Sequence, residues 1–536
     1  MKKIVACVPN FSEGRNTETI EAITLAIRET PGCRVLDVDP GASTHRTVYT
    51  FVGDPEAVVE GALAAARVAG ERIDMRRHSG EHPRFGAMDV CPFVPVSGVT
   101  MEDCARIAEH FGRKLAEALS VPVFLYEAAA RTPERRKLPD VRRGEYEALA
   151  ERLKDPRWKP DFGPAAFVPT WGATAAGARM FLIAYNVNIL GTPNQAHRIA
   201  LDLREAGRGP DQPGKLKDVK GMGWFVAEHN LAQVTVNLNN YHVTPIHVLF
   251  EEVKAAAARL GVGVAGSEIV GVVPLEAIMA AADHYIEKEG LFVYEDDRKI
   301  RLAVERLGLN AITPFTPEEK IIEYRVAEAP DEPLAGMPLR GFVESVADRS
   351  TAPGGGSVAA AVAAMGVGLA AMTAKLTYGV RKFEKVDAQM RRIIPPLHEA
   401  ARRLIPMIDA DTTAYNDYVA ALRLSGSTPE DRENRRRAIQ QALKAAVAVP
   451  LETMLLADAV WDAFKEAARS GNPACRSDLQ VGAKALETGI YGACCNVFIN
   501  LADIEDETYK NRVTREADAL RRRAAEACAD ILKMLA

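Results

Sequence analysis

The sequence contains few cysteines. There are eight in 536 residues, and no two of them are spaced as CxxC. Neither a disulfide framework nor a thiolate metal site is indicated by so sparse a set. Reduced thiols of this kind are typical of the cytosol, so we expect a cytoplasmic protein.

Long hydrophobic runs are also missing. The apolar start of the chain ends at Val8, which is too short for a signal peptide. The longest apolar stretch, residues 358–372, consists mostly of Ala, Gly and Val, which predicts a buried helix with close neighbours instead of a membrane span. The net charge is only −5, so we expect neither nucleic acid nor a membrane as a partner.

The chain is too long for one hydrophobic core, which predicts two to four domains. In residues 1–180, sequence patterns typical of strands alternate with patterns typical of helices, which predicts an α/β layer domain. Short β-branched or aromatic runs indicate strands, and apolar residues at helical spacing indicate helices. The strands are expected at 4–8, 35–38, 47–52 and 121–126, and the helices at 55–69 and 101–119.

A second unit is predicted over residues 181–326, in the order βαββαβ of the split-βαβ or ferredoxin-like pattern. Thr244 is expected to cap its second helix, and Thr316 to open a further short helix through a capping box. The elements are an alternating strand to residue 189, a helix over 192–206, strands at 224–227 and 233–238, a helix to about residue 260 and a strand at 262–265.

Strand signals almost vanish after this unit. Residues 327–338 contain three prolines and no apolar periodicity, which predicts an interdomain linker. Long helical patterns follow, with a capping-box start at Thr428. Residues 339–536 are therefore predicted to be an all-α helical bundle.

The densest polar cluster is RRHSGEHPR at residues 76–84. His78, Glu81 and His82 match the HxxEH string of zinc hydrolases, a motif that requires a helix. Gly80 inside the string and Pro83 directly after it both disfavour a helix. Two other interpretations stay open: solvated loop histidines, or an imidazole general base beside arginines such as Arg84 that hold carboxylates.

Residues 162–172 form a second motif, FGPAAFVPTWG, between the two α/β units. Two prolines, two glycines and three aromatic residues indicate a shaped apolar groove with accessible backbone donors. Small-molecule sites favour such domain junctions. An ordinary proline-rich connector is the alternative.

The helical part opens with STAPGGGS at residues 350–357. The motif lacks the lysine of a P-loop, which argues against an ATP site. Glycines before a helix still let an anion or another ligand approach free N–H groups. A flexible entry loop that permits tight helix packing is the alternative.

One carboxylate, Asp411, interrupts a regular apolar stripe that indicates the inward face of a bundle helix. Asp409 is rotated by roughly 200° from it and faces elsewhere, and Pro406 should kink the helix. An unpaired buried carboxyl has a raised pKa. We interpret Asp411 as catalytic, with an ion pair to an arginine such as Arg476 as the alternative. The stripe is Leu397, Ala401, Leu404, Ile408, Asp411, Tyr415, Tyr418 and Leu422.

The predicted bundle holds one histidine, His398, and four scattered cysteines. It therefore cannot build the His/Cys zinc centre of nucleobase deaminases. We expect no metal, and any deamination here would depend on the acid–base groups of the protein.

Long strings spread over nearly the whole chain resemble formiminotransferase-cyclodeaminase. In the first part these are CVPNFSEG at 7–14, GEHPRFGAMDVCPFVPV at 80–96, DFGPAAFVPTWGATAAGAR at 161–179 and DQPGKLKDVKG at 211–221. In the helical part they are APGGGSVAAA at 352–361, RRIIPP at 391–396, DAD at 409–411 and CRSDLQVGAKALE at 475–487.

The resemblance implies two α/β transferase subdomains, residues 1–180 and 181–326, the linker 327–338 and an all-α cyclodeaminase domain, 339–536. It implies that His82 is the catalytic base of the transferase and Asp411 the acid–base residue of the cyclodeaminase. It also implies a folate site made of Gly163, Pro164, Ala165, Ala166, Phe167, Val168, Pro169, Thr170, Trp171 and Gly172.

The implied reaction moves the formimino group of N-formimino-L-glutamate to tetrahydrofolate, the co-substrate, and then closes 5-formiminotetrahydrofolate to 5,10-methenyltetrahydrofolate with loss of ammonia. This places the protein in histidine degradation and one-carbon metabolism. Polyglutamylated folate and a homo-oligomer are implied as well, and Lys215, Lys217 and Lys220 are candidates to hold the anionic tail. The competing hypotheses are a zinc hydrolase using His78, Glu81 and His82, and a catalytically inert folate-binding protein.

Overall fold

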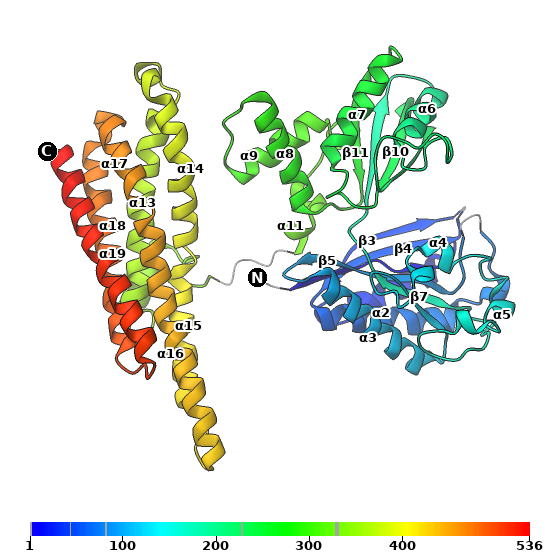
Figure 1. Cartoon of the computed structure of the whole chain (residues 1–536), viewed down its shortest axis with the longest axis horizontal. Helices are drawn as coiled ribbons and strands as arrows, with labels where there is room; N and C mark the ends of the chain where they lie inside the picture. Colours follow the sequence, from blue (N-terminus) through cyan, green and yellow to red (C-terminus); the bar gives the residue numbers. More distant parts are fainter. Residues whose placement is uncertain (1–2, 43, 81–82, 227–228, 327–331) are drawn as a thin grey trace. The chain divides into compact units, whose positions relative to one another are not determined.

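The computed structural model describes residues 3–42, 44–80, 83–226, 229–326 and 332–536. The chain divides into two compact units, Met1–Glu328 and Ala329–Ala536. Figure 1 shows that the first unit combines sheets and helices and that the second is built of long helices.

A mixed sheet forms the centre of the first subdomain. The strand order is β1-β4-β2-β5-β7-β6, with β3 beside β4. β7 runs parallel to β5 and β6, and the other pairs are antiparallel. The elements are β1 (Ile4–Cys7), β2 (Asn10–Phe11), α1 (Thr17–Arg28), β3 (Arg34–Gly41), β4 (Arg46–Gly53), α2 (Pro55–Arg72), η1 (Met75–Arg77), β5 (Met88–Ser97), α3 (Met101–Leu119), β6 (Val123–Glu127), α4 (Leu138–Val141), α5 (Leu149–Arg152) and β7 (Thr174–Ala178).

The two faces of this sheet contribute to different cores. Successive residues of a strand point to opposite faces. On β1, Val5 and Cys7 join the core formed with α1, α2 and α3, whereas Ala6 joins the core of the second subdomain. Arg325, at the end of that subdomain, donates to the carbonyl of Leu36 at 2.5 Å. The helices α2 and α3 lie on one face of the sheet, as Figure 1 shows.

The second subdomain confirms the ferredoxin-like prediction. β8, α6, β9, β10, α7 and β11 follow in the order βαββαβ, and the antiparallel sheet has the order β11-β8-β10-β9. The elements are β8 (Ile183–Ile189), α6 (Pro193–Leu203), β9 (Val219–Val226), β10 (Leu231–Leu238), α7 (Ile246–Arg259), β11 (Val264–Val270), α8 (Leu275–Glu289), α9 (Asp296–Leu307), α10 (Pro317–Lys320) and α11 (Ile322–Val326).

Two predicted helix starts in this subdomain differ from the structure. The hydroxyl of Thr244 donates to the carbonyl of Lys217 at 2.7 Å instead of capping α7, and Pro245 occupies the N-cap position. Thr316 is the N-cap of α10, but its side chain makes no capping hydrogen bond. In both places the sequence predicts the start of a helix but not the partner of the threonine side chain.

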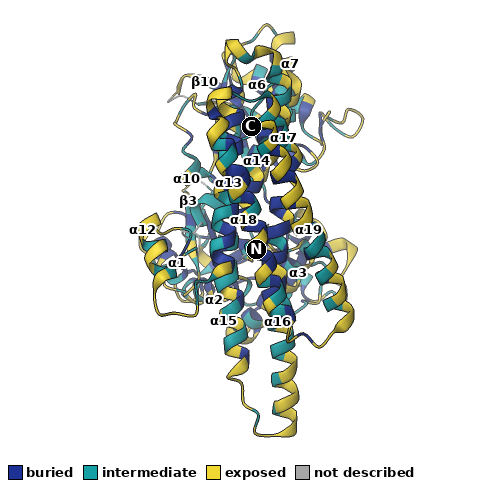
Figure 2. Ribbon diagram, turned by 90° about the vertical axis from the view of Figure 1, so that its left-hand side faces the viewer, coloured by how far each residue is buried: buried dark blue, intermediate teal, exposed yellow. Residues whose placement is uncertain are grey.

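The second unit is the predicted helical bundle. Figure 2 shows that the tip where α15 and α16 meet projects from the bundle and is exposed. The elements are α12 (Leu339–Ala347), α13 (Gly355–Thr377), α14 (Asp387–Leu404), α15 (Met407–Leu422), α16 (Pro429–Asp458), α17 (Trp461–Ser470), α18 (Arg476–Leu501) and α19 (Glu507–Met534).

α13 packs against α18 almost backbone to backbone. A β-carbon on Gly366 would lie 2.7 Å from the carbonyl oxygen of Gly482, and one on Gly489 would lie 2.6 Å from the β-carbon of Ala363. α13 is longer than the apolar run in the sequence and, among the described helices, is the one that is long and apolar enough to cross a membrane, a test that core helices of soluble proteins also pass. The close packing is that of a core helix.

The predicted interruption at Pro406 is confirmed, since α14 ends at Leu404 and α15 begins at Met407. The apolar stripe keeps its register up to Ile408, which is buried. Beyond Ile408 the prediction of a continuous inward stripe is wrong, because Asp411, Tyr415 and Tyr418 are only half-buried. Leu422 is 38% exposed, whereas Ala414 and Ala421 are buried. The break at Pro406 has therefore changed which face of α15 points into the bundle.

Candidate functional site

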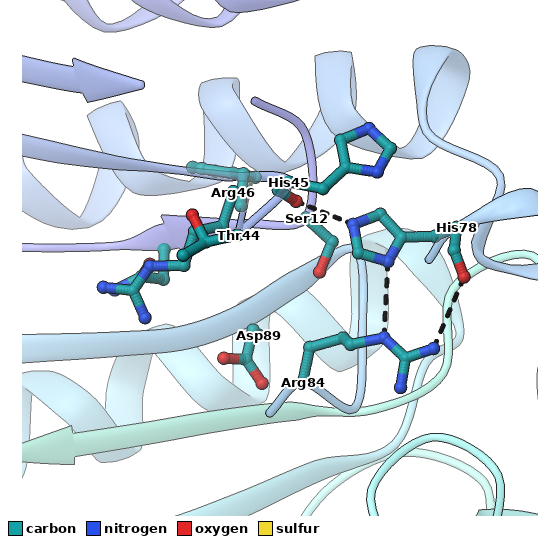
Figure 3. Close-up of a pocket in the computed structure, with 9 residues that line it drawn as sticks. Ser12, Thr44, His45, Arg46, His78, Arg84 and Asp89 are labelled. Atoms are coloured by element: carbon teal, nitrogen blue, oxygen red, sulfur yellow. Dashed lines mark hydrogen bonds between the residues drawn. The ribbon is translucent and has the colours of Figure 1, made fainter. Parts of the chain in front are cut away.

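A narrow polar pocket lies where strands β2, β4 and β5 of the first subdomain meet (Figure 3). The rings of His45 and His78 stack with their centroids 4.3 Å apart, and Arg84 reaches His78 from below in the figure. The loop from His78 to Arg84 contains the predicted HxxEH string. The pocket is lined by Asn10, Phe11, Ser12, Thr44, His45, Arg46, His78, Arg84 and Asp89.

His78 is held as a neutral imidazole. Its Nδ1 accepts from Nε of Arg84 at 3.3 Å, and a guanidinium only donates. Nδ1 is therefore unprotonated, and Nε2 donates to the carbonyl of His45 at 2.7 Å. Burial lowers the pKa of His78, and the neighbouring charges of His45 and Arg84 lower it further. Both ring nitrogens are engaged, so His78 is a poor candidate for the general base.

This arrangement also disfavours the zinc hypothesis. A zinc ligand must offer the lone pair of a ring nitrogen, and the lone pair of His78 already accepts from Arg84. Glu81 and His82, the other two residues of the string, lie outside the described residues. Gly80, the residue before Glu81, lies against the pocket, since a β-carbon on it would be 2.4 Å from the carbonyl oxygen of Thr44.

His45 links the loop after β2 to the loop that carries the motif. Its Nε2 lies 3.2 Å from Oε1 of Glu13, and its Nδ1 lies 2.9 Å from the carbonyl oxygen of Ser79. Burial acts to raise the pKa of Glu13, but the backbone N–H groups of Asn16 and Arg15 and the nearby His45 outweigh it and lower the pKa. An ionised Glu13 therefore fixes His45 against the motif.

Arg84 is fully occupied by the protein. Its Nη2 lies 2.7 Å from Glu147 and its Nη1 lies 3.2 Å from Glu145, and its side chain is 12% exposed. The suggestion that Arg84 holds a substrate carboxylate is not supported in this arrangement. The side chain instead positions His78 and the end of the motif.

The base of the pocket is a buried ion pair that the sequence did not reveal. Asp89 is buried, pairs with Arg142 and accepts from the backbone N–H of Phe85 at 3.0 Å. The acid is on β5 and the arginine follows α4, 53 residues later. A buried pair of this kind fixes geometry more than it adds stability.

The predicted folate loop lies beside the motif. The backbone N–H of Met75 donates to the carbonyl of Thr170 at 3.0 Å, and that of Ala87 donates to the carbonyl of Trp171 at 2.7 Å. Gly163 and Gly172 both have positive φ, 81° and 82°, which a residue with a β-carbon rarely adopts. Between them the loop is largely exposed, whereas Trp171 is buried and anchors its end.

A larger cavity of about 720 Å³ lies at the end of β9 and β10 in the second subdomain. It is in the size range of small-molecule sites. Of the three candidate lysines, Lys215 pairs with Glu252 at 2.6 Å and Lys217 lies 3.9 Å from Glu205. Lys220 lines the cavity, together with Arg204, Glu205, Ala206, Val219, Gly221, Met222, Thr235, Val236, Asn237 and Asn239.

In the second unit, Asp411 lies against the glycine-rich start of α13. Its Oδ2 is 3.4 Å from Oγ of Ser357. Burial raises the pKa of Asp411, and hydrogen bonds from Ser357 offset this only in part. Among the described residues no basic side chain pairs with it, and Arg476 donates to the carbonyl of Ala536 instead. The ion-pair alternative with Arg476 is therefore wrong.

Gly356 makes room for Asp411, so Gly356→Ala is expected to abolish the function of this carboxylate. A β-carbon at position 356 would lie 2.1 Å from Oδ1 of Asp411. Alanine normally stabilises a helix relative to glycine by about 0.5–1 kcal/mol, so a loss of activity cannot come from helix propensity. Gly368→Ala is the matched control, because nothing lies within 4 Å of a β-carbon there. Comparable activity of both variants would contradict the contact.

Three family descriptions cover the chain. Residues 4–179 match "Formiminotransferase domain, N-terminal subdomain" and residues 184–327 match "Formiminotransferase domain". Residues 338–519 match "Formiminotransferase-cyclodeaminase". The matches follow the first subdomain, the second subdomain and the helical unit in turn.

Three similar proteins match this chain over nearly their own full length. The formimidoyltransferase-cyclodeaminase of Sus scrofa is 56% identical over 536 residues, which cover 100% of this chain and 99% of the relative. The glutamate formimidoyltransferase of Streptococcus pyogenes serotype M1 is 41% identical over 54% of this chain and 95% of its own. A solved formiminotetrahydrofolate cyclodeaminase from Thermotoga maritima covers 37% of this chain and 96% of its own, at 28% identity and a TM-score of 0.34. The chain belongs to the formimidoyltransferase-cyclodeaminase family, bifunctional enzymes of histidine and folate metabolism.

Proposed function

We propose that two separate acid–base centres of this chain act in turn on one folate. In the first unit, N5 of tetrahydrofolate attacks the formimino carbon of N-formimino-L-glutamate. His82 accepts the proton of N5 and returns it to the glutamate nitrogen, so that the bond between this nitrogen and the formimino carbon breaks and glutamate leaves. His78 and His45 support this assignment indirectly, because both are engaged by partners in the pocket. Holding both substrates in one site removes the entropy cost of their encounter.

In the helical unit, N10 attacks the formimino carbon of 5-formiminotetrahydrofolate and closes the methenyl bridge. Ammonia leaves poorly unless its nitrogen is protonated. We assign both proton transfers to Asp411, whose carboxylate takes the proton of N10 and returns it to the departing nitrogen. The observation that carries this assignment is a partly buried carboxyl with a raised pKa, held against Gly356 and Ser357.

The folate site of the first unit is proposed to consist of the loop from Gly163 to Gly172. The cavity lined by Lys220 is proposed to receive the anionic part of the folate. A lysine at a cavity wall attracts carboxylates. Burial raises the pKa of Glu127 near this cavity, and the charges of Arg179 and Lys220 offset the rise only in part.

Lys220→Ala is expected to raise the KM for polyglutamylated tetrahydrofolate with little change in kcat, because it removes binding common to ground and transition states. An exposed charge contributes about 0.2–1 kcal/mol, so the rise should be no more than about fivefold. Lys215→Ala is the control, since Lys215 is paired with Glu252. An equal rise in KM for the monoglutamate and the polyglutamate would show that Lys220 does not contact the tail.

We also propose that the enzyme is cytoplasmic, needs no metal and forms a homo-oligomer. The eight cysteines are all free thiols, which supports a reducing compartment. Exposed apolar side chains on α13 and α18, such as Met365, Val481 and Ile499, offer a surface that a second copy can cover.

The proposed function is tested by incubating the enzyme with tetrahydrofolate and formiminoglutamate in the presence of EDTA. Methenyltetrahydrofolate absorbance, free glutamate and free ammonia are followed together. Equal amounts of the three products are expected. Release of glutamate without ammonia, or loss of turnover in the chelator, would contradict the proposal.

A further inference from the structure

Asp409, two residues before Asp411, is buried and bound to the second half of the predicted interdomain linker, residues 327–338. Asp409 is only 7% exposed. Oδ1 accepts from the backbone N–H of Leu334 at 2.8 Å, and Oδ2 accepts from that of Ala335 at 2.9 Å. Hydrogen bonds from two successive N–H groups to one carboxylate are charge-assisted and stronger than neutral ones.

The same turn of α15 is also held by α13. The hydroxyl of Ser357 donates to the carbonyl of Ile408 at 2.7 Å and lies 3.1 Å from the hydroxyl of Thr412. Leu334, Ala360 and Ile408 form a small buried apolar cluster next to these bonds. The first turn of α15 is therefore fixed by the linker segment through Asp409 and by α13 through Ser357.

This turn needs outside support. α15 begins directly after the interruption at Pro406, which occupies its N-cap position without a capping side chain. Proline removes a backbone donor, so the hydrogen-bond ladder does not carry the geometry of α14 into α15. Asp411 lies within the first turns of α15. Its carboxylate packs so closely against Gly356 that even a β-carbon would not fit at position 356. A small rotation of α15 would move Asp411 away from the glycine-rich start of α13.

We infer that Asp409 is a positioning residue of the cyclodeaminase site, whose carboxylate ties the end of the interdomain linker to the first turn of α15 and so holds Asp411 in place. This inference rests on the proposed role of Asp411. It gives the linker segment at Leu334 and Ala335 a part in the second reaction as well as in joining the two units.

Asp409→Asn and Ala335→Pro remove the contact from its two ends. Asparagine keeps one acceptor oxygen and loses the other, and proline at 335 has no N–H to donate. Each is expected to lower cyclodeaminase kcat by about 10–100-fold, because small misplacements of a catalytic group cost factors of this size. Transferase activity should stay within twofold. Asp417→Asn, an exposed carboxylate on the same helix, is the control.

The pH profile separates positioning from simple stability. Asp411 must start as a carboxylate to accept the N10 proton, so cyclodeaminase activity falls as the pH drops through its pKa. Burial raises that pKa. A loosened turn would admit water to Asp411 and so lower its pKa. In Asp409→Asn, the fall of cyclodeaminase activity on the acidic side of the pH profile should therefore occur at lower pH. The loss in the double variant should be smaller than the product of the two single losses, since both changes act on the same carboxylate.

Asp411→Asn is measured beside these variants. If it abolishes cyclodeamination while Asp409→Asn changes neither kcat nor the acidic limb, the inference about Asp409 is wrong and the role of Asp411 stands. Multiplying losses in the double variant would also overturn it. If Asp411→Asn keeps cyclodeaminase activity, the proposed function of the helical site fails first.

Discussion

Asp411→Asn is expected to stop cyclodeamination and leave formimino transfer intact. Asparagine has nearly the same shape as aspartate but cannot take up or release a proton near neutral pH. General acid–base groups contribute about 10²–10⁴-fold, so cyclodeaminase kcat should fall by a factor in that range. With tetrahydrofolate and formiminoglutamate supplied together, glutamate should be released at the normal rate while methenyltetrahydrofolate and ammonia do not form.

Two features of the structure make this variant informative. Asp411 has no basic partner among the described residues, so its replacement leaves no buried cation unpaired. The backbone N–H of Ser357 donates to Asp411, and it can donate equally to the amide oxygen of asparagine. Unchanged ammonia release would show that another group transfers the protons, and an equal fall in both activities would show that the two sites are not separable.

His82→Ala is expected to have the opposite effect. Loss of the imidazole removes the proposed acceptor of the N5 proton, and transferase kcat should fall by about 10²–10⁴-fold. Cyclodeamination of added 5-formiminotetrahydrofolate should be unchanged. His78, four residues earlier in the sequence, is not expected to substitute, because both of its ring nitrogens are engaged. His110→Ala is the control, since this histidine is exposed on α3.

A second measurement distinguishes the base from a structural or metal-binding histidine. Free imidazole in the buffer should restore part of the transferase activity of His82→Ala, because a small base can enter the space left by the side chain. Under the zinc hypothesis, added zinc would restore activity and imidazole would not. Rescue by zinc would therefore contradict the proposed role of His82.

The sequence predicted the main elements where local signals are strong. The order βαββαβ in the second subdomain, the interruption at Pro406 and the capping box at Thr428 with Asp431 are all present. Strand β7 was missed because its sequence, TAAGA, has no β-branched or aromatic run beyond one threonine. Its small residues are required by packing, since a β-carbon on Gly177 would lie 2.5 Å from the ring of Tyr126.

The site residues, like the elements, were predictable only where the local sequence carries a signal. Asp411 was found because it interrupts a regular apolar stripe on its own helix. Asp409 was only said to face elsewhere, because its partners are backbone N–H groups 74 and 75 residues earlier, and these leave no mark in the sequence. His45, Asp89 and Arg142 were missed around the first pocket, since only the folded sheet brings β4, β5 and the segment after α4 together.

The central claim is tested most directly by mixing Asp411→Asn and His82→Ala protein in one assay with tetrahydrofolate and formiminoglutamate. Each variant alone should form almost no methenyltetrahydrofolate. The mixture should form it, because the first variant releases 5-formiminotetrahydrofolate and the second converts it with loss of ammonia. A mixture as inactive as its components, when each still carries out its own half-reaction, would contradict two independent centres that act in turn on the same folate.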